Sequence, residues 1–294
     1  RMRLVCVGDS FTEGVADEFR PDGEYLGWSD RVAAALARAE PVEYANLAVR
    51  GKLLDQVVDV QVPAAEALQP DILTFHAGGN DVLRRGTDLP DLFRRYDEAV
   101  AEICTSDRRV VLFTCLTRAG GTGKLADAIA ARLDEFNDNV REVARRHGAL
   151  VVEIDSAEAF NDRRFWNADR LHLNAEGHKR VAAAVLETLG MPGDAKWREP
   201  LPPVKARTKA EDLVADLKWA GNHFAPWVWR RLRARVSQPA AAGTWGFGLW
   251  NDPFAMNLLG GVARRLPALP NAAWFFYALP PNHLTLRDGA PGHG

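Results

Sequence analysis

Short apolar runs alternate with longer amphipathic stretches over the first 190 residues of the chain. The apolar runs predict strands at 3–7, 42–46, 71–76, 109–114 and 150–155, and most are bounded by glycine, proline, asparagine or charged residues. Between the strands, helical periodicity predicts helices near 28–39, 53–68, 91–104, 125–147 and 175–189. Nearly continuous apolar strands separated by helices are typical of a parallel sheet covered on both faces. The pattern therefore predicts an α/β fold with a five-stranded parallel sheet.

A linker and a further helix are predicted after the last of these segments. Residues 192–208 are rich in proline and charge, and residues 209–222 carry apolar side chains at helical spacing. Residues 227–236 combine two tryptophans with four arginines. That composition suits a segment lying on an anionic membrane or nucleic acid, or a helix packing its aromatic side chains on the body of the protein. We favour packing, because Trp227 and Trp229 do not share one helix face.

The composition changes again from residue 239. The last 56 residues hold only five charged side chains and are dense in aromatic, glycine and proline residues, with one strand-like run at 272–278. Too few strands are present there to bury both faces of a sheet. We therefore expect a domain over 1–191, a proline-rich linker and helical extension over 192–238, and an incomplete β-rich tail over 239–294.

Composition narrows the class of protein. A chain of 294 residues with 47% hydrophobic residues can bury a large core, and a net charge of −2 argues against a nucleic-acid binder. The three cysteines have no metal-ligand spacing. No apolar stretch reaches the roughly 20 residues that span a bilayer. We expect a reduced, cytoplasmic protein with no transmembrane segment; because the chain begins at Arg1, secretion stays an alternative.

A serine lies at the end of the first predicted strand. Ser10 follows Gly8 and Asp9, and ligands of open α/β sheets bind beyond the carboxyl ends of the strands. A serine hydroxyl becomes a nucleophile only when an imidazole removes its proton and an acid orients that imidazole. Ser10 is therefore a candidate nucleophile, and its alternative role is to cap the following helix.

The pair Asp169 and His172 supplies the other two groups. A three-residue separation lets one loop present both side chains, so His172 is the candidate base and Asp169 the acid that orients it. His76, at the end of a predicted strand, is the competing histidine, either as a substrate contact or as a structural residue. Zinc ligation by Asp169 and His172 is the weaker interpretation, because no third ligand lies nearby.

Two segments carry candidate donors for an oxyanion, the charged oxygen of a tetrahedral intermediate. Gly51 and Asn80 both follow strand ends, and their N–H groups would act together with the backbone N–H of Ser10. Gly51 alone is equally explained by an ordinary turn. Asn80, like Asp81, also suits a turn that caps the next helix.

Other residues around these segments give weaker indications of substrate. The glycine-rich residues 117–124 suit a lid. Arg84 and Arg85 suit either a polar substrate or solvated surface, and Trp166 either an acyl pocket or packing. With no long hydrophobic lid, a small or polar acyl ester is favoured over a long-chain triglyceride.

These motifs together resemble the SGNH hydrolases, also called the GDSL esterase/lipase family. The four blocks that carry the resemblance occur in order: Gly8-Asp9-Ser10, Gly51, the Gly-Gly-Asn-Asp run at 78–81, and Asp169-x-x-His172. The resemblance covers about residues 3–190 and implies a three-layer αβα sandwich of flavodoxin-like type, a triad of Ser10, His172 and Asp169, and an oxyanion hole of Ser10, Gly51 and Asn80. Residues 209–236 resemble an extension of actinobacterial members. Residues 245–253 and 265–277 resemble part of a concanavalin-like β-sandwich.

The expected function is that of a serine esterase acting on short-chain acyl or acetyl esters, including acetylated carbohydrate. The resemblance implies no metal and no organic cofactor, and a small-molecule ester as the partner. Two alternatives stand beside it. One is an acyltransferase or thioesterase with the same triad, and the other is a non-catalytic carbohydrate-binding protein.

Overall fold

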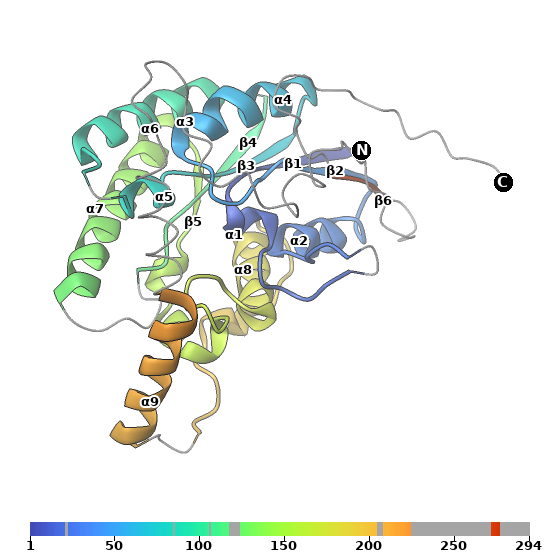
Figure 1. The fold of residues 1–294 in the computed structure, drawn as a ribbon. Helices are drawn as coiled ribbons and strands as arrows, with labels where there is room; N and C mark the ends of the chain where they lie inside the picture. The colour runs from blue at the N-terminus through green and yellow to red at the C-terminus, as the bar shows by residue number, and fades with distance from the viewer. Residues whose placement is uncertain are drawn as a thin grey trace. The chain divides into compact units, whose positions relative to one another are not determined.

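A parallel β-sheet lies at the centre of the larger of two compact units (Figure 1). The computed structural model describes residues 1–20, 23–84, 86–105, 107–117, 124–204, 208–224 and 272–276. Of these, residues up to 200 and 272–276 belong to the larger unit, and the described residues from 201 to 224 to the smaller. The strands run in the order β5–β4–β3–β1–β2–β6. They are β1 (Met2–Gly8), β2 (Val42–Asn46), β3 (Ile72–His76), β4 (Arg109–Phe113), β5 (Leu150–Val152) and β6 (Ala272–Phe276).

The sheet contains the five strands that the apolar runs predict. The predicted α/β fold with a parallel five-stranded sheet is confirmed, since β1 to β5 pair only in parallel. A sixth strand extends it: β6 pairs in parallel with β2, within the segment expected to form a separate β-rich tail. Pairing with β2 satisfies backbone groups that an edge strand leaves open. The remaining tail residues, including 245–253, lie outside the described part of the chain.

The burial of β1 explains why the strands read as continuous apolar runs. Successive side chains point to opposite faces of a sheet, yet Leu4, Val5, Cys6 and Val7 are all buried. Both faces must therefore be covered, and neither position of the alternation is left for polar residues.

Two groups of helices cover the two faces (Figure 1). The helices α2 and α8 pack together on one face, whereas α3, α4, α6 and α7 enclose the main core cluster on the other. The helices of this unit are α1 (Ser10–Glu13), α2 (Trp28–Leu36), α3 (Leu54–Gln56), α4 (Val62–Ala67), α5 (Gly79–Val82), α6 (Leu89–Ile103), α7 (Lys124–His147) and α8 (Ala175–Thr188). This is the expected three-layer αβα arrangement.

The predicted helix over 53–68 is interrupted rather than continuous. A π-helical turn, Val57–Gln61, separates α3 from α4, and Pro63 follows in the first turn of α4. Proline has no N–H to donate within a helix, and π turns often occur at functional sites. The turn places Gln61 beside the strand that leads to Ser10.

The start of the predicted linker packs against the sheet domain. Residues 195–198 form a 3₁₀ turn in which Trp197 is buried, and its indole N–H donates to Glu187 on α8 at 2.6 Å. In the smaller unit, α9 (Lys209–Trp219) is capped by Thr208, which exchanges hydrogen bonds with Glu211. The likeness of residues 209–236 to an actinobacterial extension stays a prediction, and residues 227–236 lie outside the described residues.

No helix in the described ranges is long and apolar enough to cross a membrane. The expected cytoplasmic location stays a prediction.

Candidate active site

The loop after β1 presents Ser10 at the carboxyl edge of the sheet. β1 ends at Gly8, and Asp9 caps α1 by accepting the N–H of Phe11 at 3.1 Å, so that Ser10 is the first residue of α1. The capping role that was the alternative for Ser10 therefore belongs to Asp9. A Cβ on Gly8 would lie 2.6 Å from the carbonyl oxygen of His76. Only glycine allows this close approach of the backbones.

A buried glutamine fixes the same turn from the opposite side. The side chain of Gln61 accepts the N–H of Gly8 at 2.7 Å, and its amide donates to the carbonyl of Gly8 at 2.9 Å. Both backbone groups of Gly8 are therefore satisfied although the strand ladder ends there. This position was not found from the sequence, where Gln61 lay in an ordinary helical pattern.

The structure brings Ser10, His172 and Asp169 together. The Nε2 atom of His172 lies 3.1 Å from Oγ of Ser10, and its Nδ1 atom lies 2.7 Å from Oδ2 of Asp169. The two nitrogens of the His172 imidazole thus contact Ser10 and Asp169, although Ser10 lies 162 positions from His172 in the chain. These distances are the ones a proton relay from hydroxyl to imidazole requires.

The environment of Asp169 favours its ionised form. Burial opposes the charge, but the hydrogen bonds from His172 and from the backbone N–H groups of Leu171 and His172 outweigh it and lower the pKa of Asp169 to about 2. At neutral pH, Asp169 is therefore a carboxylate that accepts a hydrogen bond from the Nδ1–H group of His172, leaving Nε2 facing Ser10 as an acceptor.

Two contacts hold the loop that carries Asp169 and His172. The N–H of Asn167 donates to the carbonyl of His172 at 2.8 Å, and Asn174 caps α8 by accepting the N–H of Gly177. The indole N–H of Trp166 donates to the carbonyl of Phe160 at 2.7 Å, so this N–H group is already hydrogen-bonded within the protein.

Asn80 lies at the start of α5, with its side-chain amide turned toward the Ser10 loop. Its Nδ2 atom donates to Oδ2 of Asp9 at 3.2 Å and to the carbonyl oxygen of Lys52 at 3.0 Å. An amide nitrogen carries two hydrogens, so both are engaged. The carbonyl of Lys52 is the neutral, weaker acceptor of the two.

Gly51 directly precedes Lys52 in the loop after β2. Its φ is +74°, in the left-handed region that favours glycine, and no described atom lies within 4 Å of the position a Cβ would take. Glycine is therefore required by the turn, and the space beside it is open. The neighbouring Asp81 accepts the N–H of Leu54 at 2.9 Å, which ties this loop to α5. The blocks containing Ser10, Gly51 and Asn80 are thus bonded to one another.

His76 is buried below this site and is not paired with Ser10. Its Nδ1 atom lies 3.2 Å from Oδ1 of Asp9, and its ring packs on Phe11 with centroids 4.4 Å apart. Burial opposes protonation, but the charge and hydrogen bond of Asp9, with the contact to Cys115, outweigh it and raise the pKa of His76 to about 10. The competing histidine is therefore an internal partner of Asp9.

Two of the remaining candidates fall in parts of the chain that the structure does not describe. Arg85 and residues 118–123 of the expected lid lie outside the described residues. No group of three or more histidine, cysteine or acidic side chains placed to hold a metal occurs in the part of the chain that the structure describes.

The structure has a parallel sheet between two helical layers, with serine, histidine and aspartate hydrogen-bonded at the carboxyl edge of the sheet. This arrangement is typical of hydrolases that use an activated serine. The chain belongs to the GDSL-like lipase/acylhydrolase family, whose sequence profile matches residues 6–180. No curated protein matches the chain in sequence.

Several solved structures share the fold. LAE5, an α/β hydrolase enzyme from the metagenome of Lake Arreo, is 25% identical, with a TM-score of 0.53 over 64% of this chain and 95% of its own. A variant of Axe2, an acetyl xylan esterase from Geobacillus stearothermophilus, is 20% identical, with a TM-score of 0.52 over 69% of this chain and 97% of its own. TesA is 19% identical, with a TM-score of 0.53 over 64% of this chain and 98% of its own.

Proposed function

We propose that the protein hydrolyses small carboxylic esters, including acetyl esters, through an acyl-enzyme on Ser10. The observation that carries this proposal is the continuous hydrogen-bonded chain from Ser10 through His172 to Asp169, with separations of 3.1 Å and 2.7 Å. The serine is not acidic enough to ionise alone, and this chain gives its proton an acceptor.

The proposed reaction has two stages that use the same imidazole. Oγ of Ser10 attacks the ester carbonyl carbon as its proton moves to Nε2 of His172. The tetrahedral intermediate then breaks its bond to the alcohol oxygen, which takes the proton from His172. A water molecule next attacks the acyl-Ser10 and gives one proton to His172. Collapse releases the carboxylic acid and returns the proton to Ser10.

The developing negative oxygen is proposed to lie among the backbone N–H groups of Ser10 and Gly51 and the side-chain amide of Asn80. Asn80 can donate to an oxyanion when its amide gives up the hydrogen bond to the neutral carbonyl of Lys52 and forms one to the charged oxygen instead. Its other N–H stays on Asp9. Loss of one such donor costs about 2.7–4 kcal/mol of barrier in enzymes of this chemistry.

Exposure of the site supports esters of bulky alcohols such as sugars. The side chains of His172 and Asp169 are 21% and 27% exposed, so an ester held on a bulky alcohol such as a sugar can reach them. The same fold serves the acetyl xylan esterase described above, which is consistent with this substrate class.

The test compares Ser10→Ala with the wild type on p-nitrophenyl esters from acetyl upward and on acetylated sugars. We expect the variant to lose hydrolysis of every ester while keeping its thermal unfolding profile, and a fluorophosphonate probe to label Ser10 in the wild type. Ser156→Ala, which alters an exposed serine bonded to the carbonyl of Glu153, is the matched control. Full activity in Ser10→Ala, or labelling at another residue, would refute the proposal.

The same assay separates the other activities that this triad permits. Addition of a competing alcohol tests for acyl transfer, and an acyl thioester tests for thioesterase activity. A transferase would form the new ester in preference to free acid. A purely carbohydrate-binding protein would bind acetylated sugars and turn over none of them.

A further inference from the structure

The protein contains a second histidine–aspartate pair, buried beneath the first. His76 and Asp9 are 9% and 4% exposed, and Nδ1 of His76 lies 3.2 Å from Oδ1 of Asp9. This pair has no place in the proton relay, in which His172 contacts Ser10 and Asp169. Its geometry therefore calls for another explanation.

The Asp9 carboxylate connects two parts of the proposed catalytic machinery to His76. It accepts the N–H of Phe11, which caps the helix that begins with Ser10, and it accepts one amide hydrogen of Asn80 at 3.2 Å. The position of the carboxylate therefore sets the position of an oxyanion donor as well as the start of α1. Its third partner is His76.

A buried carboxylate needs a compensating positive charge or several hydrogen bonds. The rings of Phe11 and Phe113 flank His76, so the surroundings of the pair are largely apolar. His76 is the basic side chain in direct contact with the Asp9 carboxylate, and the raised pKa of about 10 keeps it protonated at neutral pH.

We propose that His76 is a positioning residue, whose buried imidazolium holds the Asp9 carboxylate directed at Asn80, so that the Asn80 amide is held ready for the oxyanion. This inference rests on the proposed function. It assigns to His76 no contact with substrate and no proton transfer in the reaction.

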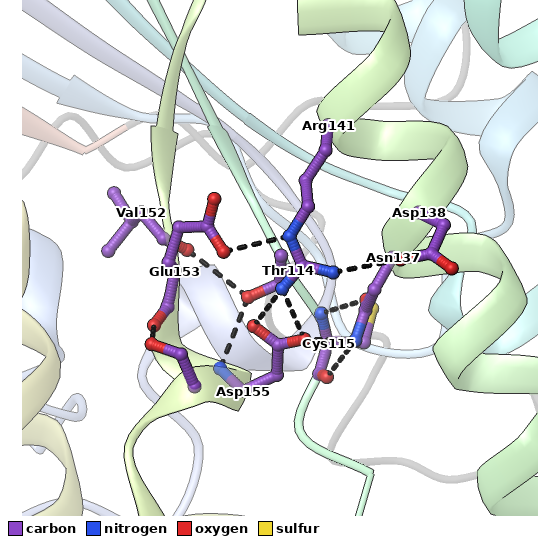
Figure 2. A network of polar contacts seen from close by, with 9 residues as sticks. Thr114, Cys115, Asn137, Asp138, Arg141, Val152, Glu153 and Asp155 are labelled. Atoms are coloured by element: carbon purple, nitrogen blue, oxygen red, sulfur yellow. Dashed lines mark hydrogen bonds and ion pairs between the residues drawn. The ribbon is translucent and has the colours of Figure 1, made fainter.

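The far side of the His76 ring contacts Cys115. Its Nε2 atom lies 3.9 Å from Sγ of Cys115. Figure 2 shows Cys115 beside Asn137 of α7; the amide of Asn137 accepts the N–H of Cys115 at 2.7 Å and donates to its carbonyl at 2.8 Å. The contacts therefore run from α7 through Cys115 and His76 to Asp9 and Asn80.

The first experiment measures kcat and KM on p-nitrophenyl acetate for His76→Gln, His76→Phe, Asn80→Ala and the double variant His76→Phe with Asn80→Ala. Loss of the charge should leave Asn80 mispositioned, so kcat should fall about tenfold in His76→Gln and up to about 10²-fold in His76→Phe, with KM changed by less than threefold. In the double variant, removing His76 should cost little beyond Asn80→Ala, because residues acting through one contact are not additive.

His147→Gln is the matched control. It removes another histidine–aspartate pair, in which Nε2 of His147 lies 2.7 Å from Asp97, at the end of α7. We expect wild-type kcat from this variant. Wild-type kcat in His76→Phe, or fully multiplicative losses in the double variant, would overturn the proposal.

The second experiment observes the charge directly and does not depend on activity or on variants that fold. In wild-type protein, ¹⁵N NMR of the histidine rings at pH 7.5 should show both nitrogens of His76 protonated. A neutral His76 ring overturns the proposal. Failure of the proposed esterase function is distinguished from this outcome, because it would appear as inactive wild-type protein whatever the state of His76.

Discussion

Arg50 and Glu13 join the helix that begins with Ser10 to the loop that contains Gly51. The Nη2 and Nε atoms of Arg50 donate to Oε1 of Glu13 at 2.6 Å and 3.0 Å, and the backbone N–H of Arg50 donates to Oε2 at 2.6 Å. With the bond from Nε to Oε2 at 3.2 Å, four bonds to one carboxylate fix both the side chain and the backbone next to Gly51. The distance between the nucleophile and the proposed backbone donor is therefore set by this pair.

The first prediction is that Arg50→Met lowers kcat about three- to tenfold with little change in stability. An exposed ion pair contributes about 0–1 kcal/mol to folding, whereas a shifted oxyanion donor loses part of the 10²–10³-fold effect of complete removal. Steady-state kinetics and thermal unfolding measure the two quantities. Arg94→Met, which breaks exposed pairs with Asp91 and Glu98 on α6, should leave kcat unchanged. Equal kcat values for both variants would contradict the positional role.

The second prediction concerns Asp169→Asn. An asparagine keeps the size of the side chain but donates rather than accepts, so the imidazole of His172 takes the wrong tautomer. We expect kcat to fall about 10³- to 10⁴-fold on p-nitrophenyl acetate, with a melting temperature close to that of the wild type. Because Asp169 has a pKa of about 2 in the folded protein, its protonation should not limit activity above about pH 4. A loss of less than tenfold would show that Asp169 does not orient His172.

Most of the candidate site could be predicted from short local motifs in the sequence. Ser10 follows a recognisable strand end, and the spacing of Asp169 and His172 places both side chains on one loop. Their meeting with Ser10 follows from the parallel sheet, which gathers the carboxyl ends of strands at one edge. The strands could also be predicted from the sequence, because strands that are buried on both faces carry few polar residues.

The Asp9–His76 pair could not be derived in the same way. It depends on the register in which β3 pairs with β1, where His76 lies opposite Gly8 and so next to Asp9. Apolar periodicity identifies strands but does not fix the register between two parallel strands. The contact of Gln61 with Gly8 depends on a π-helical turn, which ordinary helical spacing does not reveal.

The third prediction is that Asn137→Ala destabilises the fold by about 2–4 kcal/mol. Asn137 is fully buried and hydrogen-bonds both backbone groups of Cys115, which its loss would leave unsatisfied (Figure 2). Urea unfolding measures the change. Asp138→Asn is the neighbouring control, because the Asp138 side chain is 82% exposed in its pair with Arg141; its effect should stay within about 0.5 kcal/mol. Equal stability of the two variants would show that the Cys115 backbone finds other partners.

A buried histidine on α8 makes the stability depend on pH in the acid range. Burial lowers the pKa of His178 to about 4 from 6.5. Its Nε2 atom lies 3.2 Å from the carbonyl of Val15, and its Nδ1 atom has no hydrogen-bond partner among the described residues. The folded protein therefore holds the neutral ring, with the hydrogen on Nε2. Between about pH 4 and 6.5 the unfolded chain binds this proton and the folded chain does not, so stability falls as the pH falls.

The fourth prediction is that His178→Gln reduces the dependence of the unfolding free energy on pH in the acid range. The dependence in the alkaline range should remain. Each pKa unit corresponds to 1.36 kcal/mol, so the wild type should lose about 3 kcal/mol between pH 6.5 and 4 through His178, whereas the variant should not. His76 affects stability in the opposite direction, because its pKa rises from 6.5 to about 10 on folding. Its contribution to the unfolding free energy is therefore complete below pH 6.5 and is lost as the pH rises toward 10. Urea unfolding at half-unit pH steps measures both slopes. An unchanged acid slope in His178→Gln would mean that carboxylates alone produce it.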